Sequence, residues 1–179
     1  AAFRSLRLQS FDDFEVWVVD DSNDNSTALL IQDECDQDDR FHYLKNEERL
    51  GLASSLNLAI TKASGQYIAR FDGDDECDLD RFQRQVSFLD NSPEIDVLGS
   101  SISIYSEGTD GQVFKHYPSS HKDIAKAFNL TNAIAHPTVM FRALLLRERL
   151  PFYDGSFRAS EDLELWLFLM NRGKKFKNL

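Results

Sequence analysis

The sequence predicts an α/β fold, with a doubly wound, mostly parallel central sheet and helices on both faces. Strand-like and helix-like segments alternate over the first 90 residues, which is the order that strand–helix–strand units produce. Carboxylates follow two of these strands, as the pair Asp20-Asp21 and as the run 72–75. Because open α/β sheets bind ligands at the carboxyl ends of their strands, we expect both acid groups at a ligand-binding edge.

The first 90 residues supply three short apolar strands and the helices that separate them. Apolar residues at helical spacing mark the helices, and Ser26 or Asn25 is the expected N-cap of the first. Gly65 is the expected C-cap of the second helix. Trp17 lies in the middle of the first strand and is expected in the core. In chain order, these segments are strand 14–19, helix 28–35, strand 41–44, helix 51–63, strand 66–71 and helix 79–89.

The second half continues less regularly. Ser119 or Ser120 is the expected N-cap of a helix that runs to Phe128, and Trp166 is expected in the core. Residues 1–11 resemble the middle of an amphipathic helix without a cap, so we expect a fragment of a longer protein. The remaining segments are strand 95–105, turn 108–111, strand 112–116, strand 138–141, helix 161–171 and a strand that begins within 173–179.

A chain of 179 residues with 42% hydrophobic and 28% charged residues is expected to form a single globular domain. Thirty acidic residues against twenty basic ones argue against a nucleic-acid partner, because no basic run is present to neutralise phosphates. An anionic ligand would need a local basic residue, a helix N-terminus or a bound cation. Cys35 and Cys77 lie far apart in the sequence, which indicates reduced thiols in a cytosolic protein.

The run 72–75 places three carboxylates around one glycine at the end of a strand. Carboxylates held this close repel one another unless they are protonated or bridged by a cation. Oxygen ligands suit Mg²⁺ or Mn²⁺, which keep open coordination positions that phosphate oxygens fill. The alternative is a solvated acidic turn before the next helix, because short motifs often match by accident.

Taken in order, the motifs resemble those of the family 2 glycosyltransferases with the GT-A fold. That family has a strand ending in Asp-Asp-x-Ser, an Asn before Gly-x-Ala, a helix ending in Ala-x-Gly and a strand ending in Asp-x-Asp-Asp. Two later segments, 135–142 (AHPTVMFR) and 153–167 (YDGSFRASEDLELWL), look like the acceptor-side segments of the family. The earlier motifs stand here at 20–22, 46, 51–53, 63–65 and 72–75.

The resemblance implies a role for each acidic motif. Asp21, or its neighbour Asp20, hydrogen-bonds the nucleotide base. Asp72 and Asp74 form the metal-binding Asp-x-Asp motif, with Asp74 as the direct ligand and Asp72 nearer the ribose or sugar. Asp162 is the catalytic base. This division suits an inverting displacement, because a cation neutralises the departing diphosphate while a carboxylate from a distant segment accepts the proton of the attacking hydroxyl.

Asn46, Arg49 and Glu161 are the remaining candidates for substrate binding. Arg49 either reaches a phosphate or stays at the solvated surface. Glu161 and its neighbour also suit the first turn of a helix, where the helix dipole favours acids. His136 is a candidate metal ligand, although a His-Pro pair before a strand more often forms a turn.

The predicted function is a metal-dependent inverting glycosyltransferase that uses Mn²⁺ or Mg²⁺. The expected donor is a nucleotide-diphosphate sugar, with UDP favoured, and the expected acceptor is a saccharide or lipid-linked sugar in cell-surface polysaccharide synthesis. The domain spans 1–179, with a nucleotide-sugar-binding half (1–90) and an acceptor-binding half (91–179). The resemblance also implies a cytoplasmic location, with peripheral association at the inner face of the membrane through a longer parent chain.

Three features depart from the family pattern. Its first strand and the nucleotide-binding loop after that strand are missing, Phe168 stands where an Arg is common, and no Gln-x-x-Arg-Trp segment is present. The last absence disfavours a processive polymerase. Two alternatives therefore stay open: a metal-dependent nucleotide phosphohydrolase, and a truncated nucleotide-binding domain without catalysis.

Overall fold

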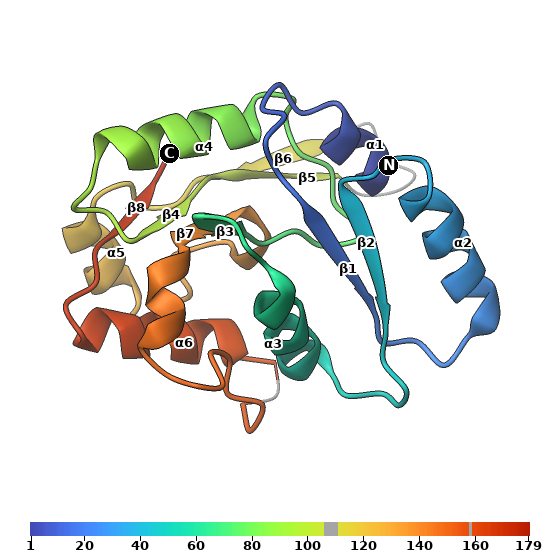
Figure 1. Cartoon of the computed structure of the whole chain (residues 1–179). Helices are drawn as coiled ribbons and strands as arrows, with labels where there is room; N and C mark the ends of the chain where they lie inside the picture. Colours follow the sequence, from blue (N-terminus) through green and yellow to red (C-terminus); the bar gives the residue numbers. More distant parts are fainter. Residues whose placement is uncertain (106–110, 158) are drawn as a thin grey trace.

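A computed structural model describes residues 1–105, 111–157 and 159–179, and it has the predicted alternation of strands and helices (Figure 1). The expected turn at 108–111 falls largely outside the described residues. The strands are β1 (Val16–Asp20), β2 (Phe41–Lys45), β3 (Tyr67–Ala69), β4 (Val97–Gly99), β5 (Ile102–Tyr105), β6 (Gln112–Lys115), β7 (Met140–Arg142) and β8 (Phe176–Asn178). The helices are α1 (Ala2–Arg7), α2 (Asn25–Cys35), α3 (Leu52–Lys62), α4 (Arg81–Asn91), α5 (His121–Ala127), α6 (Glu161–Asn171) and the short 3₁₀ helices η1 (His136–Thr138) and η2 (Ala143–Arg147).

The strands form a four-stranded sheet and two strand pairs. The sheet has the order β3-β7-β4-β8, in which β7 is antiparallel to both of its neighbours and β4 is parallel to β8. Three of its four strands therefore run in one direction, as the predicted, mostly parallel sheet requires. β1 and β2 form a separate parallel pair, and β5 and β6 form an antiparallel hairpin.

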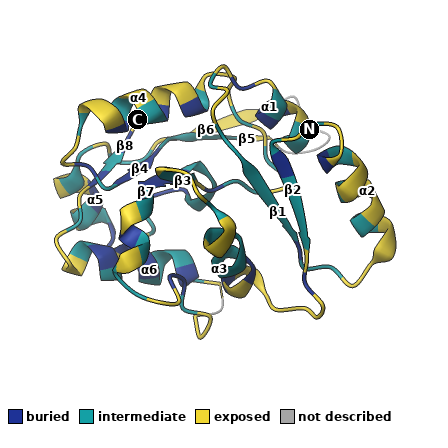
Figure 2. Cartoon of the chain, in the orientation of Figure 1, coloured by how far each residue is buried: buried dark blue, intermediate teal, exposed yellow. Residues whose placement is uncertain are grey.

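Helices cover both faces of the four-stranded sheet, as the sequence predicts. Neighbouring residues of β4 point to opposite faces, so Val97 belongs to one buried cluster and Leu98 to the other. The Val97 cluster includes residues of α3, α5 and α6, and the Leu98 cluster includes residues of α1, α2 and α4. Figure 2 shows the exposed outer faces of α2 and α4 and the buried strands between the layers. Trp166 is fully buried, which confirms its predicted place in the core.

Three local expectations are wrong. Trp17 is only half-buried, because its strand belongs to a separate two-stranded sheet, and its ring packs 4.5 Å from that of His42. Asp24, rather than Ser26 or Asn25, caps α2, because its carboxylate accepts a hydrogen bond from the Ser26 backbone N–H. The C-cap of α3 is Ala63 in an extended conformation, so Gly65 lies beyond the helix.

The second half differs from the prediction at two places. The expected strand 95–105 is two strands, because the chain leaves β4 after Gly99 and enters the β5–β6 hairpin. The helix η2 follows β7 directly and was not predicted. The Ser120 cap of α5, the hairpin return at β6 and the final strand β8 are confirmed. Within the described ranges, no helix is long and apolar enough to cross a membrane.

Candidate functional site

The acid groups lie at the ends of β1 and β3, and Asp162 lies in the first turn of α6. α3 links the end of β1 to the segment that precedes α6. Its start is bonded to the residue after β1, and Asn57 in its second turn exchanges two hydrogen bonds with the backbone of Tyr153, at 2.8 and 2.9 Å. The two halves of the chain therefore share one rigid connector beside the candidate site (Figure 1).

Asp20 is buried, with 3% of its surface exposed, and its carboxylate is fully engaged. It accepts hydrogen bonds from the Ser22 N–H (2.8 Å), the Tyr43 hydroxyl (2.9 Å) and the Lys45 ammonium (2.8 Å). Burial alone would raise its pKa, but the bonds from Lys45, Ser22 and Tyr43 hold that pKa well below the usual range. Asp20 is thus an anion that ties β1 to β2.

Asp21 is partly exposed and organises the loop that precedes α3. Its carboxylate accepts hydrogen bonds from the Asn46 amide (2.7 Å) and from the backbone N–H groups of Leu50 and Gly51 (both 2.8 Å). Gly51 has a φ of +82°, a conformation that glycine adopts without strain. Burial opposes ionisation of Asp21, but these bonds and the charge of Arg49 lower its pKa. The Arg49 side chain itself is exposed.

The end of β3 combines a buried cation with the acid run. Arg70 is 7% exposed, its guanidinium pairs with the Asp72 carboxylate, and its Nε has no hydrogen-bond partner among the described residues. Asp74 is exposed and follows Gly73 in the turn closed by the Asp75 N–H to Asp72 carbonyl bond (3.1 Å). Burial raises the pKa of Asp75, and the charges of Asp72 and Asp74 raise it further. Like charges are therefore crowded here.

The acid run fits a cation that is held jointly with a ligand. Among the described residues, no three His, Cys, Asp or Glu side chains converge to form a complete cage. Asp72 is paired with Arg70, which leaves Asp74 as the accessible carboxylate. Mg²⁺ and Mn²⁺ sites of this kind use one or two carboxylates and complete their coordination with water and phosphate oxygens. The crowding that raises the pKa of Asp75 is the repulsion that such a cation would relieve.

Glu161 and Asp162 begin α6 but differ in their surroundings. Glu161 is buried, and Asp162 is partly exposed. The Oδ2 of Asp162 accepts a hydrogen bond of 2.6 Å from the amide of Asn132. Both acids lie in the first turn, where the helix dipole favours negative charge. The dipole therefore explains why acids occur in this turn, but it does not explain the bond from Asn132.

The site also contains a pair formed by His136, which is partly exposed, and Tyr153, which is buried. The His136 Nε2 lies 3.0 Å from the Tyr153 hydroxyl, and the imidazole ring also packs against Trp166. Burial and the charge of Arg70 lower the pKa of His136 to about 4, against the opposing influence of Asp162 and Asp72. The charges of Asp72 and Asp162 thus act on the same imidazole, which stays neutral at physiological pH.

Phe168, at the position where the family often has an Arg, is partly buried and packs against the core cluster that contains α6. Its ring lies between two guanidinium groups, 4.5 Å from that of Arg149 and 5.1 Å from that of Arg172. Arg149 also forms a bidentate ion pair with Glu164. The phenyl ring thus makes cation–π contacts with two guanidinium groups.

Three residues of the site were not predicted from the sequence: Arg70, Asn132 and Tyr153. Arg70 is the one charged residue in an otherwise apolar strand, and that exception was the available signal. Asn132 lies in a loop between α5 and η1 without any motif, and Tyr153 reads as an ordinary aromatic residue. Their roles depend on contacts between segments that are far apart in the sequence.

The comparison with known families places this chain in one of them. The profile of the family described as "Glycosyl transferase family 2" matches residues 1–148. That match covers most of the chain, so this protein belongs to glycosyl transferase family 2.

Curated relatives support this membership at low identity. An uncharacterized glycosyltransferase of Methanocaldococcus jannaschii is 29% identical over 179 residues, covering 98% of this chain and 60% of the relative. The O-antigen biosynthesis glycosyltransferase WbnJ of Escherichia coli is 31% identical over 172 residues, covering 93% of this chain and 64% of the relative. The chain thus spans less than two thirds of the length of these relatives.

Solved structures establish the fold. The crystal structure of Staphylococcus aureus TarS matches with a TM-score of 0.77 at 21% identity, covering 99% of this chain and 32% of TarS. TarS 1–349 in complex with UDP-GlcNAc matches with a TM-score of 0.71 at 23% identity, covering 99% of this chain and 51% of that one. A mannosyltransferase of Pyrobaculum calidifontis in complex with GDP-Man and Mn²⁺ matches at 0.72 and 17% identity, covering 98% and 49%. The predicted GT-A-like architecture is confirmed.

Proposed function

We propose that this chain is the donor-binding and catalytic part of a metal-dependent inverting glycosyltransferase. It transfers a sugar from a nucleotide-diphosphate sugar to a saccharide or lipid-linked acceptor in polysaccharide synthesis. The nucleotide of the donor is UDP. Residues 1–90 bind the donor and 91–179 bind the acceptor. The observation that carries the proposal is that Asp74 is exposed in the crowded acid run after β3, while Asp162, on a different segment, is held by a 2.6 Å hydrogen bond from the Asn132 amide.

The donor side of the proposal follows from accessibility. Asp20 is buried and bonded by three donors, so Asp21 is the candidate for contact with the nucleotide base. Asn46 keeps Asp21 in place through its 2.7 Å amide bond. Arg49 is exposed and is available to contact a phosphate of the donor. These roles give the acid-rich first half a cationic contact of its own for an anionic donor.

A divalent cation at Asp74, with Asp72 beside it, would supply the positive charge that neutralises a departing diphosphate. The protein contributes the rest of the charge balance. Arg70 holds Asp72 in a fixed place through their ion pair, and its own guanidinium is buried. The related structures with UDP-GlcNAc, and with GDP-Man and Mn²⁺, have the same fold and support a nucleotide-sugar donor and a cation here.

Asp162 is the proposed general base. It removes the proton from the acceptor hydroxyl as the hydroxyl oxygen bonds to the anomeric carbon. The bond from that carbon to the diphosphate oxygen breaks at the same time, and the nucleoside diphosphate leaves with the electron pair. Because attack and departure take place on opposite faces of the sugar, the anomeric configuration inverts. Glu161, buried beside Asp162, lines the acceptor side.

Calorimetric titration of UDP, with Mn²⁺ and then with EDTA, tests the donor site, and a transfer assay with acceptor tests the chemistry. We expect UDP binding that needs the metal and that disappears in Asp74→Asn. Asp162→Asn should keep UDP binding but lose transfer by about 10²–10⁴-fold, the usual contribution of a general base. Full transfer activity in Asp162→Asn would refute the base assignment.

The same assay separates this proposal from a nucleotide phosphohydrolase. A transferase releases UDP in proportion to the glycosylated acceptor, and the release needs the acceptor. A phosphohydrolase releases its product from the donor at the same rate with or without an acceptor. Metal-dependent UDP binding without either product would instead indicate a binding domain without catalysis.

A further inference from the structure

Among the described residues, Asp162 has one side-chain hydrogen-bond partner, and that partner comes from a different part of the chain. The amide of Asn132 donates a 2.6 Å hydrogen bond to the Asp162 Oδ2 across thirty positions of sequence. A hydrogen bond to an ionised carboxylate is short and directional, so it fixes the orientation of the carboxyl plane. The bond engages Oδ2 and leaves Oδ1 unblocked by Asn132.

Asn132 is itself held in place. Its Oδ1 accepts a hydrogen bond from the Ile134 N–H (3.3 Å), and the preceding turn is bonded to the end of α5 through the Thr131 N–H and the Ala127 carbonyl (3.0 Å). Because the amide oxygen is fixed by the backbone, the amide N–H₂ has a defined direction, which is toward α6. The donor is therefore oriented before any substrate arrives.

The loop that contains Asn132 is held by hydrogen bonds from Asn178 of β8. The amide of Asn178 donates to the Ala133 carbonyl (3.0 Å) and to the Pro118 carbonyl (2.7 Å), and Asn178 is only 1% exposed. The residues that follow Asn132, from Ala133 to Ala135, are buried as well. The position of the Asn132 backbone is thus set by the core of the sheet.

Among the described residues, the start of α6 has no side-chain cap. Ser160 is the N-cap residue of α6, but its side chain makes no capping hydrogen bond. Residues in the first turn of a helix without a side-chain cap are less restrained than those in its middle. Among the described residues, the hydrogen bond from Asn132 is therefore the side-chain contact that restrains the Asp162 carboxylate.

We propose that Asn132 is a positioning residue for the general base, which holds the Asp162 carboxylate in the orientation that accepts the acceptor proton. This inference rests on the proposed function, because it assumes that Asp162 is the base. Asn132 itself acts through Asp162 and not on the sugar. The competing explanation is structural: the bond merely fastens the start of α6 to the loop.

The two explanations differ in what Asn132→Ala changes. A positioning residue affects the chemical step, since a misplacement of about 1 Å costs on the order of 10²-fold in rate. We expect kcat for transfer to fall by about 10–100-fold, with the KM for donor and the affinity for UDP unchanged within about twofold. Asn132→Asp keeps the shape but replaces the donor with a second carboxylate, so its loss should be at least as large.

The test is a transfer assay on the full-length natural protein, with four variants: Asn132→Ala, Asn132→Asp, Asp162→Asn and the double variant Asn132→Ala/Asp162→Asn. Single-turnover measurements with labelled donor give the residual rates. If Asn132 acts only through Asp162, the double variant is no slower than Asp162→Asn alone. Asn129→Ala is the matched control, because Asn129 lies in the same loop and its amide donates to the Lys126 carbonyl at the end of α5 (3.1 Å).

Each outcome decides one question. Wild-type rates in Asn132→Ala, with Asp162→Asn inactive, overturn the positioning role and leave the proposed function intact. Equal losses in Asn132→Ala and Asn129→Ala, accompanied by lower thermal midpoints, favour the structural explanation and also overturn it. Full activity in Asp162→Asn removes the proposed base, and the positioning role with it. A selective loss of kcat, absent in the Asp162→Asn background, supports the inference.

Discussion

At the scale of single residues, the site depends on how each carboxylate is compensated. Asp20 has three donors, Asp21 has an amide and two backbone N–H groups, and Asp72 has a guanidinium. Asp74 is the exposed member of the acid run. The partners and exposure of each carboxylate, and not its sequence context, thus distinguish the buried Asp20 from the exposed Asp74.

Asp20 provides a test of this distinction. Its pKa is depressed in the folded state, so its ionised form contributes stability that is fully present above the unfolded value of about 3.9 and is lost as the pH falls through the folded value. We expect Asp20→Asn to lower the free energy of unfolding by about 1–3 kcal/mol at pH 7. Urea denaturation at several pH values measures this difference.

The pH dependence is the decisive part of that measurement. The difference between wild type and Asp20→Asn should be largest at neutral pH and should shrink in acid, below pH of about 4. Asp13→Asn is the control, because Asp13 is exposed. A difference that stays constant from neutral pH into acid would show that the bonds to Asp20 do not depend on its charge.

The residues that could be predicted from the sequence are those that stand in ordered motifs. The acids at 20–21 and 72–75 were placed at strand ends, because apolar strands and the residues after them are local patterns. Asn132 and Arg70 were not predicted, since their significance depends on the side-chain bonds that they form to Asp162 and Asp72 in the folded chain. Trp17 was misplaced, because its burial depends on how many strands and helices flank β1.

At the scale of elements, strand and helix types were predicted well and their ends less well. Each strand of the four-stranded sheet lies within or close to a predicted strand segment, but the break after Gly99, which separates β4 from β5, was not predicted. Caps are decided by single side-chain bonds, so Asp24 replaced the expected Ser26. The helix η2 has no amphipathic period long enough to be recognised in the sequence.

Gly99, the last residue of β4, lies where the structure leaves no room for a side chain. A methyl group added at Gly99 would overlap the Asn178 Oδ1 and would lie 3.1 Å from a methyl group of Ile134. Asn178 cannot move away without losing its bonds to the Ala133 and Pro118 carbonyls. We therefore expect Gly99→Ala to lower the free energy of unfolding by about 1–3 kcal/mol, as overpacking does in close-packed cores.

Gly73→Ala is the matched control for that prediction, because a Cβ at Gly73 meets nothing within 4 Å. Its free energy of unfolding should stay within about 0.5 kcal/mol of wild type. Urea unfolding of both variants provides the comparison. Equal stability of the two glycine variants would mean that the loop above Asn178 yields easily, which would also weaken the case for a rigid support of Asn132.

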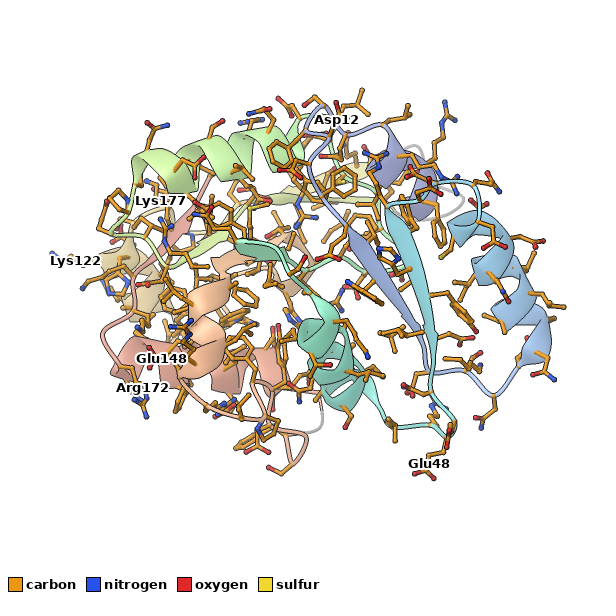
Figure 3. All side chains as sticks on the ribbon, viewed as in Figure 1. Asp12, Glu48, Lys122, Glu148, Arg172 and Lys177 are labelled. Atoms are coloured by element: carbon orange, nitrogen blue, oxygen red, sulfur yellow. The ribbon has the colours of Figure 1, made fainter. Side chains whose placement is uncertain are left out.

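At the scale of the whole molecule, charge is divided unevenly. The first 90 residues contain 20 acidic and 9 basic residues, whereas residues 91–179 contain 10 acidic and 11 basic ones. Figure 3 shows Lys122, Lys177 and Arg172 at the end of the molecule opposite α2, and Glu48 near the α3 side. The half proposed to bind an anionic donor is therefore the strongly acidic half, and it repels free UDP in the absence of a cation.

This repulsion predicts how the metal requirement depends on salt. Raising the ionic strength from about 0.01 M to about 0.15 M shortens the screening length from about 30 Å to about 8 Å. The ratio of the Kd for UDP in EDTA to the Kd in Mn²⁺ should then fall several-fold, because screening weakens both the repulsion and the attraction that the cation adds. Calorimetry at both ionic strengths measures the ratio. Uncharged uridine is the control ligand, and its affinity should depend little on metal or salt. A ratio for UDP that is the same at both ionic strengths would mean that the cation acts by direct coordination at Asp74 alone, and that the acidity of the first half plays no part in donor binding.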